Sequence, residues 1–124
     1  MTVEALPQTF TVCKVSDFAK ADLSAPFCFT GRTDAELSLV CPTRYAPPET
    51  LAREDGWRAF RVAGAMAFTL VGVLAGLTGL LAQRGIPVFV VSTFDTDYVL
   101  VKAERFREAL TALETGGYRV TETA

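Results

Sequence analysis

The sequence predicts an α+β fold, and two observations carry that prediction. Half of the 124 residues are apolar and 21% are charged, a balance typical of one globular domain or of two small halves that share a core. The second half of the chain alternates between the two-residue period of strands and the 3.6-residue period of helices. The first half shows mainly strand patterns. We therefore expect a short first part, residues 1–55, and a complete second domain, residues 56–124.

The first part predicts three strands. Phe10–Val15 and Phe27–Thr30 are apolar, and Glu36–Cys41 alternates apolar and polar residues. The polar stretch 16–26 and the segment GRTDAE predict loops between these strands. The segment PPETLARE, which begins at Pro47, predicts a short helix because its prolines stand at the start.

The second domain predicts six elements in the order βαββαβ. Strands are expected at Trp57–Val62, Ile86–Phe94, Tyr98–Lys102 and over YRVTE at residues 118–122, with Asp95–Asp97 as a tight turn. The segment Ala103–Gly117 is an amphipathic helix pattern that ends in a glycine pair. This order is the ferredoxin-like split arrangement.

The remaining helix lies in a stretch of 22 uncharged residues between Arg61 and Arg84, long enough to cross a bilayer. On a helix its large and small residues separate into two faces. Thr69 as the N-cap and Gly85 as the C-cap shorten the helix to about 15 residues, below the roughly 17–25 that a span requires. We therefore predict a core helix and no membrane segment. Its leucine face is Leu70, Leu74, Leu77 and Leu81, and its opposite face is Gly72, Gly76, Gly79 and Gln83.

The composition argues against several classes of function. The chain has no histidine, which is the commonest general base and metal ligand, and its three cysteines form no CxxC pair. The net charge is −2 and no basic stripe is present, which argues against a nucleic-acid partner. We expect no cofactor and no metal. The first ten residues lack the features of a signal peptide, and Cys13, Cys28 and Cys41 in apolar stretches fit a reducing cytoplasm.

Two segments could hold a ligand. The backbone N–H groups of Thr69 to Gly72, at the expected helix start, could bind a carboxylate. The segment STFDTD, residues 92–97, places two carboxylates beside hydroxyls and suits an ammonium or guanidinium group. Together the two segments could hold a free amino acid. An ordinary capped helix and a solvated hairpin turn explain the same residues without a ligand.

Three longer segments carry a resemblance to a known family. ELSLVCP, GWRAFRV and the stretch from FTLVGVLAGLTGLLAQ through RGIPVFVVSTFDTDYVLVK to ETGGYRV resemble the small tandem ACT-domain proteins of bacteria. They are also similar to the ACT modules of animal cytosolic arginine sensors and to aspartate kinase regulatory domains. The resemblance implies a shortened, degenerate ACT-like copy before a full ACT domain, amino-acid binding between ACT units, and homodimers. The binding residues that it implies are Ser38, Leu39, Val40, Phe68, Thr69, Leu70, Val71, Gly72, Thr93, Phe94, Asp95, Thr96 and Asp97.

Three functional hypotheses follow. The first is a regulatory module that binds an amino acid and signals through contacts with an effector protein. The second is a ligand-free dimerisation or interaction module. The third, a small enzyme that uses Asp95 and Asp97, is weakened by the absence of histidine and of any cofactor motif. The aspartate pair favours a basic amino acid on charge grounds.

Overall fold

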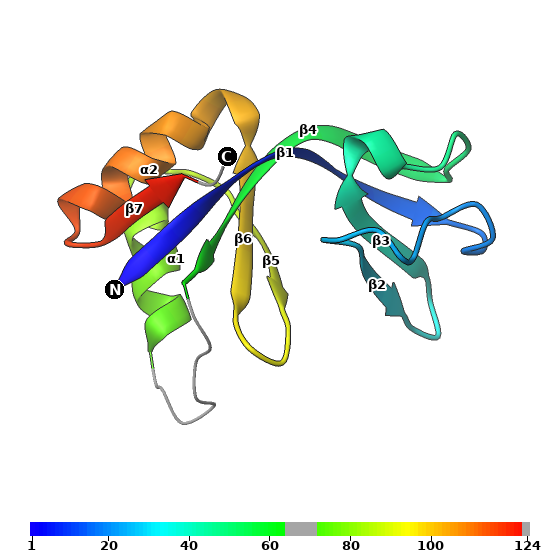
Figure 1. Cartoon of the computed structure of the whole chain (residues 1–124), viewed down its shortest axis with the longest axis horizontal. Helices are drawn as coiled ribbons and strands as arrows, with labels where there is room; N and C mark the ends of the chain where they lie inside the picture. The colour runs from blue at the N-terminus through cyan, green and yellow to red at the C-terminus, as the bar shows by residue number, and fades with distance from the viewer. Residues whose placement is uncertain (64–71, 123–124) are drawn as a thin grey trace. The chain divides into compact units, whose positions relative to one another are not determined.

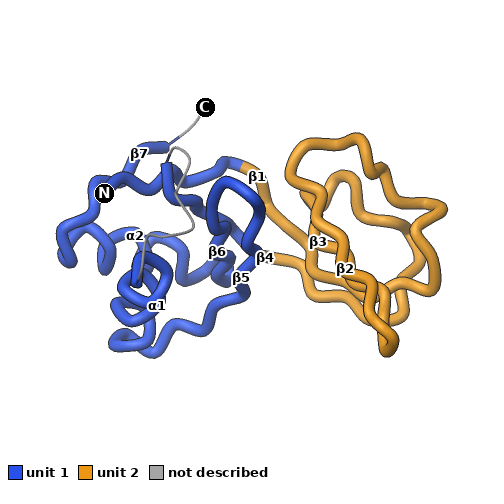
Figure 2. Tube along the Cα trace, turned by 90° about the horizontal axis from the view of Figure 1, so that it is seen from below, with its two compact units in different colours: residues 1–7, 58–124 blue, residues 8–57 orange. Residues whose placement is uncertain are grey.

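A computed structural model describes residues 1–63 and 72–122, and these form two compact units (Figure 2). Unit 1 contains Met1–Pro7 and the chain from Arg58 onward, and unit 2 contains Gln8–Trp57. The chain passes from unit 2 back to unit 1 between Trp57 and Arg58, two residues after the predicted boundary at residue 55. Residues 1–7, however, cluster with the second domain and not with the first part to which the sequence assigned them. That the first part is a degenerate ACT-like copy stays a prediction.

The sheet of unit 1 has the strand order β7-β1-β4-β6-β5 (Figure 1). Its strands are β1 (Thr2–Val15), β4 (Ala52–Val62), β5 (Phe89–Ser92), β6 (Asp97–Lys102) and β7 (Arg119–Glu122). β1 and β4 are long enough to contribute residues to both units. β4, α1, β5, β6, α2 and β7 follow one another as the predicted βαββαβ unit. The start of β1 is an additional strand, placed between β4 and β7, and pairs with β7 in parallel from Thr2↔Arg119 to Ala5↔Glu122.

Two helices supply the apolar layer of unit 1. They are α1 (Val73–Gln83) and α2 (Phe106–Thr115), the latter preceded by a 3₁₀ turn, η2 (Ala103–Arg105). Leu77 and Leu81 of α1 are completely buried, and Leu74 is partly buried against the same core, as the predicted leucine face requires. They pack in one cluster with α2 residues and with alternate residues of β1, β4 and β6, such as Val3, Phe60 and Val99. Among the described residues, no helix is both long and apolar enough to cross a membrane.

Both helices end as the glycines predict. At the end of α1, Gly85 has a φ of 65°, its N–H donates to the Ala82 carbonyl, and the N–H of Ile86 donates to the Leu81 carbonyl. Gly117, with a φ of 98°, and Tyr118 repeat this pair of bonds at the end of α2. These are Schellman motifs, which need a left-handed residue that glycine adopts without a Cβ penalty.

The start of α1 differs from the prediction. Gly72, with a φ of 82°, is the N-cap residue, three positions after the expected Thr69. The first intrahelical bond runs from the N–H of Gly76 to the Gly72 carbonyl at 2.8 Å. The left-handed conformation of Gly72 breaks the helical path, so the helix has 11 residues rather than about 15. Thr69 itself lies outside the described residues.

Unit 2 is built from β2 (Phe29–Arg32), β3 (Leu37–Pro42) and the second part of β1, in the order β2-β3-β1, with the start of β4 beside β1. β1 and β3 are antiparallel from Phe10↔Pro42 to Val15↔Leu37. Cys13, Leu39 and Cys41 are buried together, and Cys28 packs partly buried against them. All three cysteines are free thiols. Cys13 and Cys41 are buried, which confirms that they act as small apolar core residues.

Three local predictions are wrong, two of them in unit 2 or at its border and one in unit 1. The expected helix at PPETLARE is absent, because residues 52–55 begin β4 and the N–H of Leu51 donates to the Lys14 carbonyl of β1. Pairing with a distant strand outweighs the weak local preference for helix. β1 begins at Thr2 rather than Phe10, although Pro7 interrupts the pattern. The strand expected over Ile86–Phe94 is shorter, Phe89–Ser92.

Candidate ligand-binding site

The STFDTD segment forms the turn between β5 and β6. The backbone N–H and the hydroxyl of Thr93 both donate to the Thr96 carbonyl, at 2.9 Å and 3.1 Å. Thr96 is 8% exposed, and its hydroxyl donates to the Val62 carbonyl at the end of β4 at 3.1 Å. The turn is therefore closed by its own threonines and fixed to the neighbouring strand, which gives Thr96 a structural task that the sequence did not reveal.

The two aspartates of this segment differ in their surroundings. Asp95 is exposed at the tip of the turn. Asp97 is partly buried at the start of β6, opposite Ser92 of β5, and accepts a hydrogen bond from the Ser92 hydroxyl. Phe94, next to Asp95, is 79% exposed. The tip thus presents one solvated carboxylate and one carboxylate held in place by a hydroxyl, beside an aromatic ring.

The start of α1 supplies the hydrogen-bond donors of the candidate site. Because Gly72 is the N-cap, the first-turn N–H groups belong to Val73, Leu74 and Ala75, which have no acceptor within the helix. The sequence prediction placed these donors one turn earlier, at Thr69 to Gly72. Only the left-handed conformation of Gly72 shows where the helix begins, and a glycine in an apolar run does not reveal it.

The turn and the helix start lie at the same edge of unit 1. The chain leaves β4 at Val62 and enters α1 at Val73. The hydrogen bond from Thr96 to Val62 places the β5–β6 turn at that same end of β4, and both segments point to the same side in Figure 1. Backbone N–H donors and a pair of carboxylates therefore lie at the same end of the strands of unit 1.

The other predicted site residues divide into two groups. Ser38, Leu39 and Val40 are in β3 of unit 2, paired with Lys14, Cys13 and Val12 of β1. Leu39 is completely buried and Val40 is 4% exposed, so both side chains are core residues. Phe68, Thr69, Leu70 and Val71 lie outside the described residues.

A polar network on the sheet of unit 1 was not predicted. Arg61 of β4 donates to Glu4 of β1 at 3.2 Å and to the Tyr98 hydroxyl of β6 at 3.1 Å. The hydrogen bond to Tyr98, opposed by burial and assisted by Glu4, raises the pKa of Arg61 above its ordinary value. These three residues link three neighbouring strands. The side chains of Glu4 and Arg61 are 26% and 29% exposed.

Acidic and thiol groups do not gather for metal binding: within residues 1–63 and 72–122, no three histidine, cysteine or acidic side chains are placed to hold an ion. Burial raises the pKa of all three thiols, that of Cys41 to about 12. A thiol that stays protonated is a poor nucleophile and metal ligand.

Comparisons with known proteins agree with this architecture. A family model described as the ACT domain matches residues 52–115, which include β4, α1, the β5–β6 turn and α2. The solved structure of protein Atu0741 from Agrobacterium tumefaciens is similar at 29% identity and a TM-score of 0.88, over 99% of this chain and 93% of that one. Protein VC0802 from Vibrio cholerae matches at 24% identity and a TM-score of 0.73, over 90% and 86%.

The regulatory subunit of aspartate kinase from Thermus thermophilus, in its ligand-free form, shares the fold. It is 12% identical with a TM-score of 0.65, over 94% of this chain and 97% of that one. A comparison with curated protein sequences returned no match.

Proposed function

Because the chain belongs to the ACT-domain family, we propose that it is a regulatory module that binds a free amino acid and is not itself an enzyme. The main observation behind the proposal is that the start of α1 and the β5–β6 turn lie at the same end of the strands of unit 1, within the matched residues 52–115. The likeness to an aspartate kinase regulatory subunit supports a regulatory role.

The two segments suit the two ends of an amino acid. The N–H groups of Val73, Leu74 and Ala75 sit at the positive end of the helix dipole and would take the α-carboxylate. Asp97, positioned by Ser92, and Asp95 at the tip would take the ammonium group or a basic side chain. A basic amino acid is the ligand that this charge favours.

Binding would be reported through a protein contact. In this proposal the module is a homodimer, the binding residues implied by the family resemblance include Ser38, Leu39, Val40 and 68–72, and an effector protein responds to the occupied state. A ligand orders the segments that it touches, and a partner that prefers the ordered state binds more tightly when the ligand is present.

The test is a thermal-shift screen against the twenty amino acids, followed by titration calorimetry. A ligand that binds only the folded state adds about 2.7 kcal/mol of stability at a hundred times its Kd. Asp97→Asn keeps the acceptor for Ser92 and removes the charge, so it should weaken binding without unfolding the turn. Asp34→Asn changes an exposed aspartate between β2 and β3 of unit 2 and is the matched control.

Two results would count against the proposal. Equal affinity of Asp97→Asn and the wild type would show that the site is elsewhere. The absence of binding to all twenty amino acids would leave the ligand-free dimerisation module as the better account, and sedimentation would then test whether the chain dimerises.

A further inference from the structure

The three cysteines of unit 2 come together on one face of its sheet, although they are far apart in the sequence. Cys13 of β1 and Cys41 of β3 are buried in the same apolar cluster as Leu39. Cys28, one residue before the start of β2, packs partly buried against that cluster. All three are free thiols, and the proposed function uses none of them.

The pairing of β2 with β3 places Cys28 opposite Cys41. The two strands are antiparallel, and Phe29 is paired with Val40 at the end of the register that lies away from the turn. One step further along both strands, the residue that faces Cys41 is Cys28.

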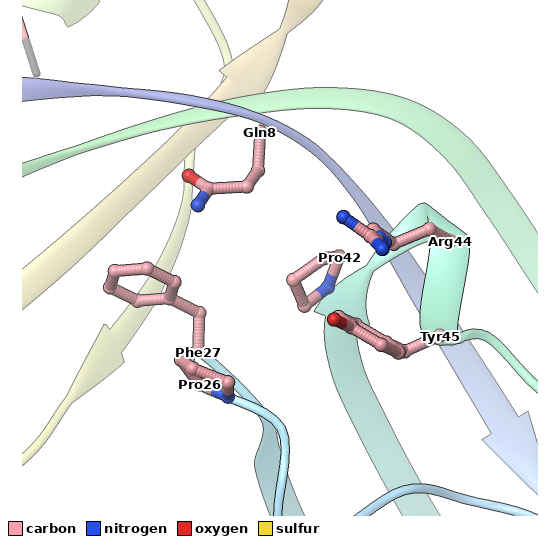
Figure 3. Close-up of a pocket in the computed structure, with 6 residues that line it drawn as sticks. All are labelled: Gln8, Pro26, Phe27, Pro42, Arg44 and Tyr45. Carbon is pink, nitrogen blue, oxygen red and sulfur yellow. The ribbon is translucent and has the colours of Figure 1, made fainter. Parts of the chain in front are cut away.

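The residues on the far side of the two cysteines also lie close together. Phe27 and Pro42 line the same small hollow of unit 2 (Figure 3). Phe27 packs edge-on against Phe10 with the ring centroids 6.3 Å apart, and Phe10 is the partner of Pro42 in the pairing of β1 with β3. Since the two segments are paired before the cysteines and remain close after them, the cysteines between are side by side.

The distance from the turn determines the kind of pair that the two cysteines form. At the turn between β2 and β3, the N–H of Thr33 donates to the Glu36 carbonyl at 3.0 Å, so these two residues are a hydrogen-bonded pair. Bonded and non-bonded pairs alternate along antiparallel strands, and Cys28 and Cys41, five pairs further on, are therefore a non-bonded pair. The Cα atoms of such a pair lie about 4.5 Å apart, within the roughly 4.4–6.8 Å that a disulfide spans.

Cys13 is kept out of such a bond by its position on β1. Thr11 is the residue opposite Cys41, and Cys13 is opposite Leu39, so Cys13 and Cys41 are diagonal neighbours. Diagonal neighbours have Cα atoms about 7–8 Å apart, which is too far for a disulfide unless the backbone moves.

We infer that Cys28 and Cys41 are a redox-sensitive pair, which a small-molecule disulfide such as oxidised glutathione converts into a cross-strand disulfide bond. The bond fixes β2 to β3 at the open end of their hairpin and makes unit 2 harder to unfold. Cys13 stays a thiol.

The reaction is an exchange in two steps. Cys28 is partly exposed, so its thiolate attacks one sulfur of glutathione disulfide, the S–S bond breaks, and one glutathione leaves and takes up the proton that Cys28 released. The thiolate of Cys41 then attacks Cys28 Sγ and expels the second glutathione, which takes up the proton of Cys41. Two protein thiols are oxidised, and one glutathione disulfide is reduced to two thiols.

The surroundings of the two thiols make this exchange slow at neutral pH. Burial and the nearby Asp22 carboxylate raise the pKa of Cys28, so little thiolate is present. Burial, together with the neighbouring thiols, raises the pKa of Cys41 to about 12, but its attack takes place within one molecule and is assisted by its position beside Cys28. The other charged groups that act on the cluster are Arg53, beside Cys13 and Cys41, and Asp55, beside Cys13. The pair therefore responds to lasting oxidising conditions.

The experiment is oxidation of the full, folded chain with glutathione disulfide, followed by alkylation of the remaining thiols, digestion with trypsin and mass spectrometry. Cleavage after Lys14, Lys20, Arg32 and Arg44 leaves the three cysteines on separate peptides, 1–14, 21–32 and 33–44. We expect peptides 21–32 and 33–44 to be joined by a disulfide and peptide 1–14 to be alkylated. The same chain oxidised in urea is the control and should give a mixture of all three pairings, because the register is then lost.

Rates and single substitutions test the order of the steps. The rate should rise about tenfold for each pH unit below the pKa of Cys28, as the thiolate fraction does. Cys13→Ala should form the disulfide at the wild-type rate, Cys41→Ala should stop at the mixed disulfide of Cys28 with glutathione, and Cys28→Ala should stay reduced.

Thermal unfolding tests the effect on unit 2. The oxidised wild type should melt about 10 °C higher than the reduced protein, because the bond restricts the unfolded chain, and dithiothreitol should reverse the shift. The inference is overturned if peptide 1–14 takes part in the disulfide of the folded chain, if only the unfolded chain forms a disulfide, or if the oxidised form melts below the reduced form. These three results come from the wild type and do not depend on whether the variants fold.

Discussion

Thr96 offers a direct test of how the STFDTD turn is built, through the substitution Thr96→Val. Valine has nearly the same shape, so the change removes one hydroxyl and its 3.1 Å hydrogen bond to the Val62 carbonyl, at a residue that is only 8% exposed. A buried hydrogen bond is worth about 1–2 kcal/mol when its acceptor is left unsatisfied. For a chain of this size that loss lowers the melting temperature by roughly 4–8 °C.

Thermal unfolding followed by circular dichroism, together with urea unfolding, would measure the loss for Thr96→Val. Thr96→Ser keeps the hydroxyl and should recover most of the stability. Thr93→Val, in the same turn but exposed, should cost less, because its hydroxyl and its backbone N–H share one acceptor. A melting temperature unchanged in Thr96→Val, or lowered equally by all three substitutions, would refute the assigned role of this hydroxyl.

Three further predictions concern the rest of the fold. Gly79→Ala should raise the free energy of unfolding by up to about 1 kcal/mol, because no described atom lies within 4 Å of an added Cβ. Gly76→Ala should raise it less, because its added Cβ would lie 3.2 Å from the Tyr118 hydroxyl. Urea unfolding that ranks the two variants in the reverse order would contradict this prediction. Stability should fall as the pH rises above 9.0, the ordinary pKa of a thiol, because burial raises the pKa of Cys41 to about 12 and the thiol therefore ionises more readily in the unfolded chain. Urea unfolding at several pH values should show a weaker decline for a Cys41→Ala variant. Arg58→Lys should lower the free energy of unfolding by roughly 1–2 kcal/mol. It removes the two guanidinium hydrogen bonds to the Leu6 carbonyl and the stacking of the guanidinium 4.3 Å from the ring centroid of Phe106. Equal melting temperatures for Arg58→Lys and the exposed control Arg107→Lys would disprove this prediction.

The elements that the sequence predicted well are those whose signals are local. The glycines after α1 and α2 mark the helix ends because only a left-handed residue closes a Schellman motif, and Gly85 and Gly117 do so. Leu77 and Leu81 are buried because helical spacing fixes the face of a helix. The apolar runs IPVFVV and YVLV on either side of the STFDTD turn predicted its two strands for a similar reason.

The errors arise where distant parts of the chain decide the structure. Residues 52–54 of the segment PPETLARE become strand because Lys14 and Thr11 of β1 bond to Leu51 and Asp55, and nothing within the segment indicates those partners. The late start of α1 depends on the left-handed backbone of Gly72. The predicted binding residues stay predictions, and four of them, 68–71, lie outside the described residues.

The parallel pairing of Thr2–Ala5 with Arg119–Glu122 has a consequence for how unit 1 folds. The paired segments lie at opposite ends of a long loop of chain, and closing a long loop costs conformational entropy before its contacts form. The strands of unit 2, in contrast, all lie within residues 8–57. The joining of β7 to the start of β1, which brings together residues far apart in the sequence, should therefore be the slow step in the folding of unit 1.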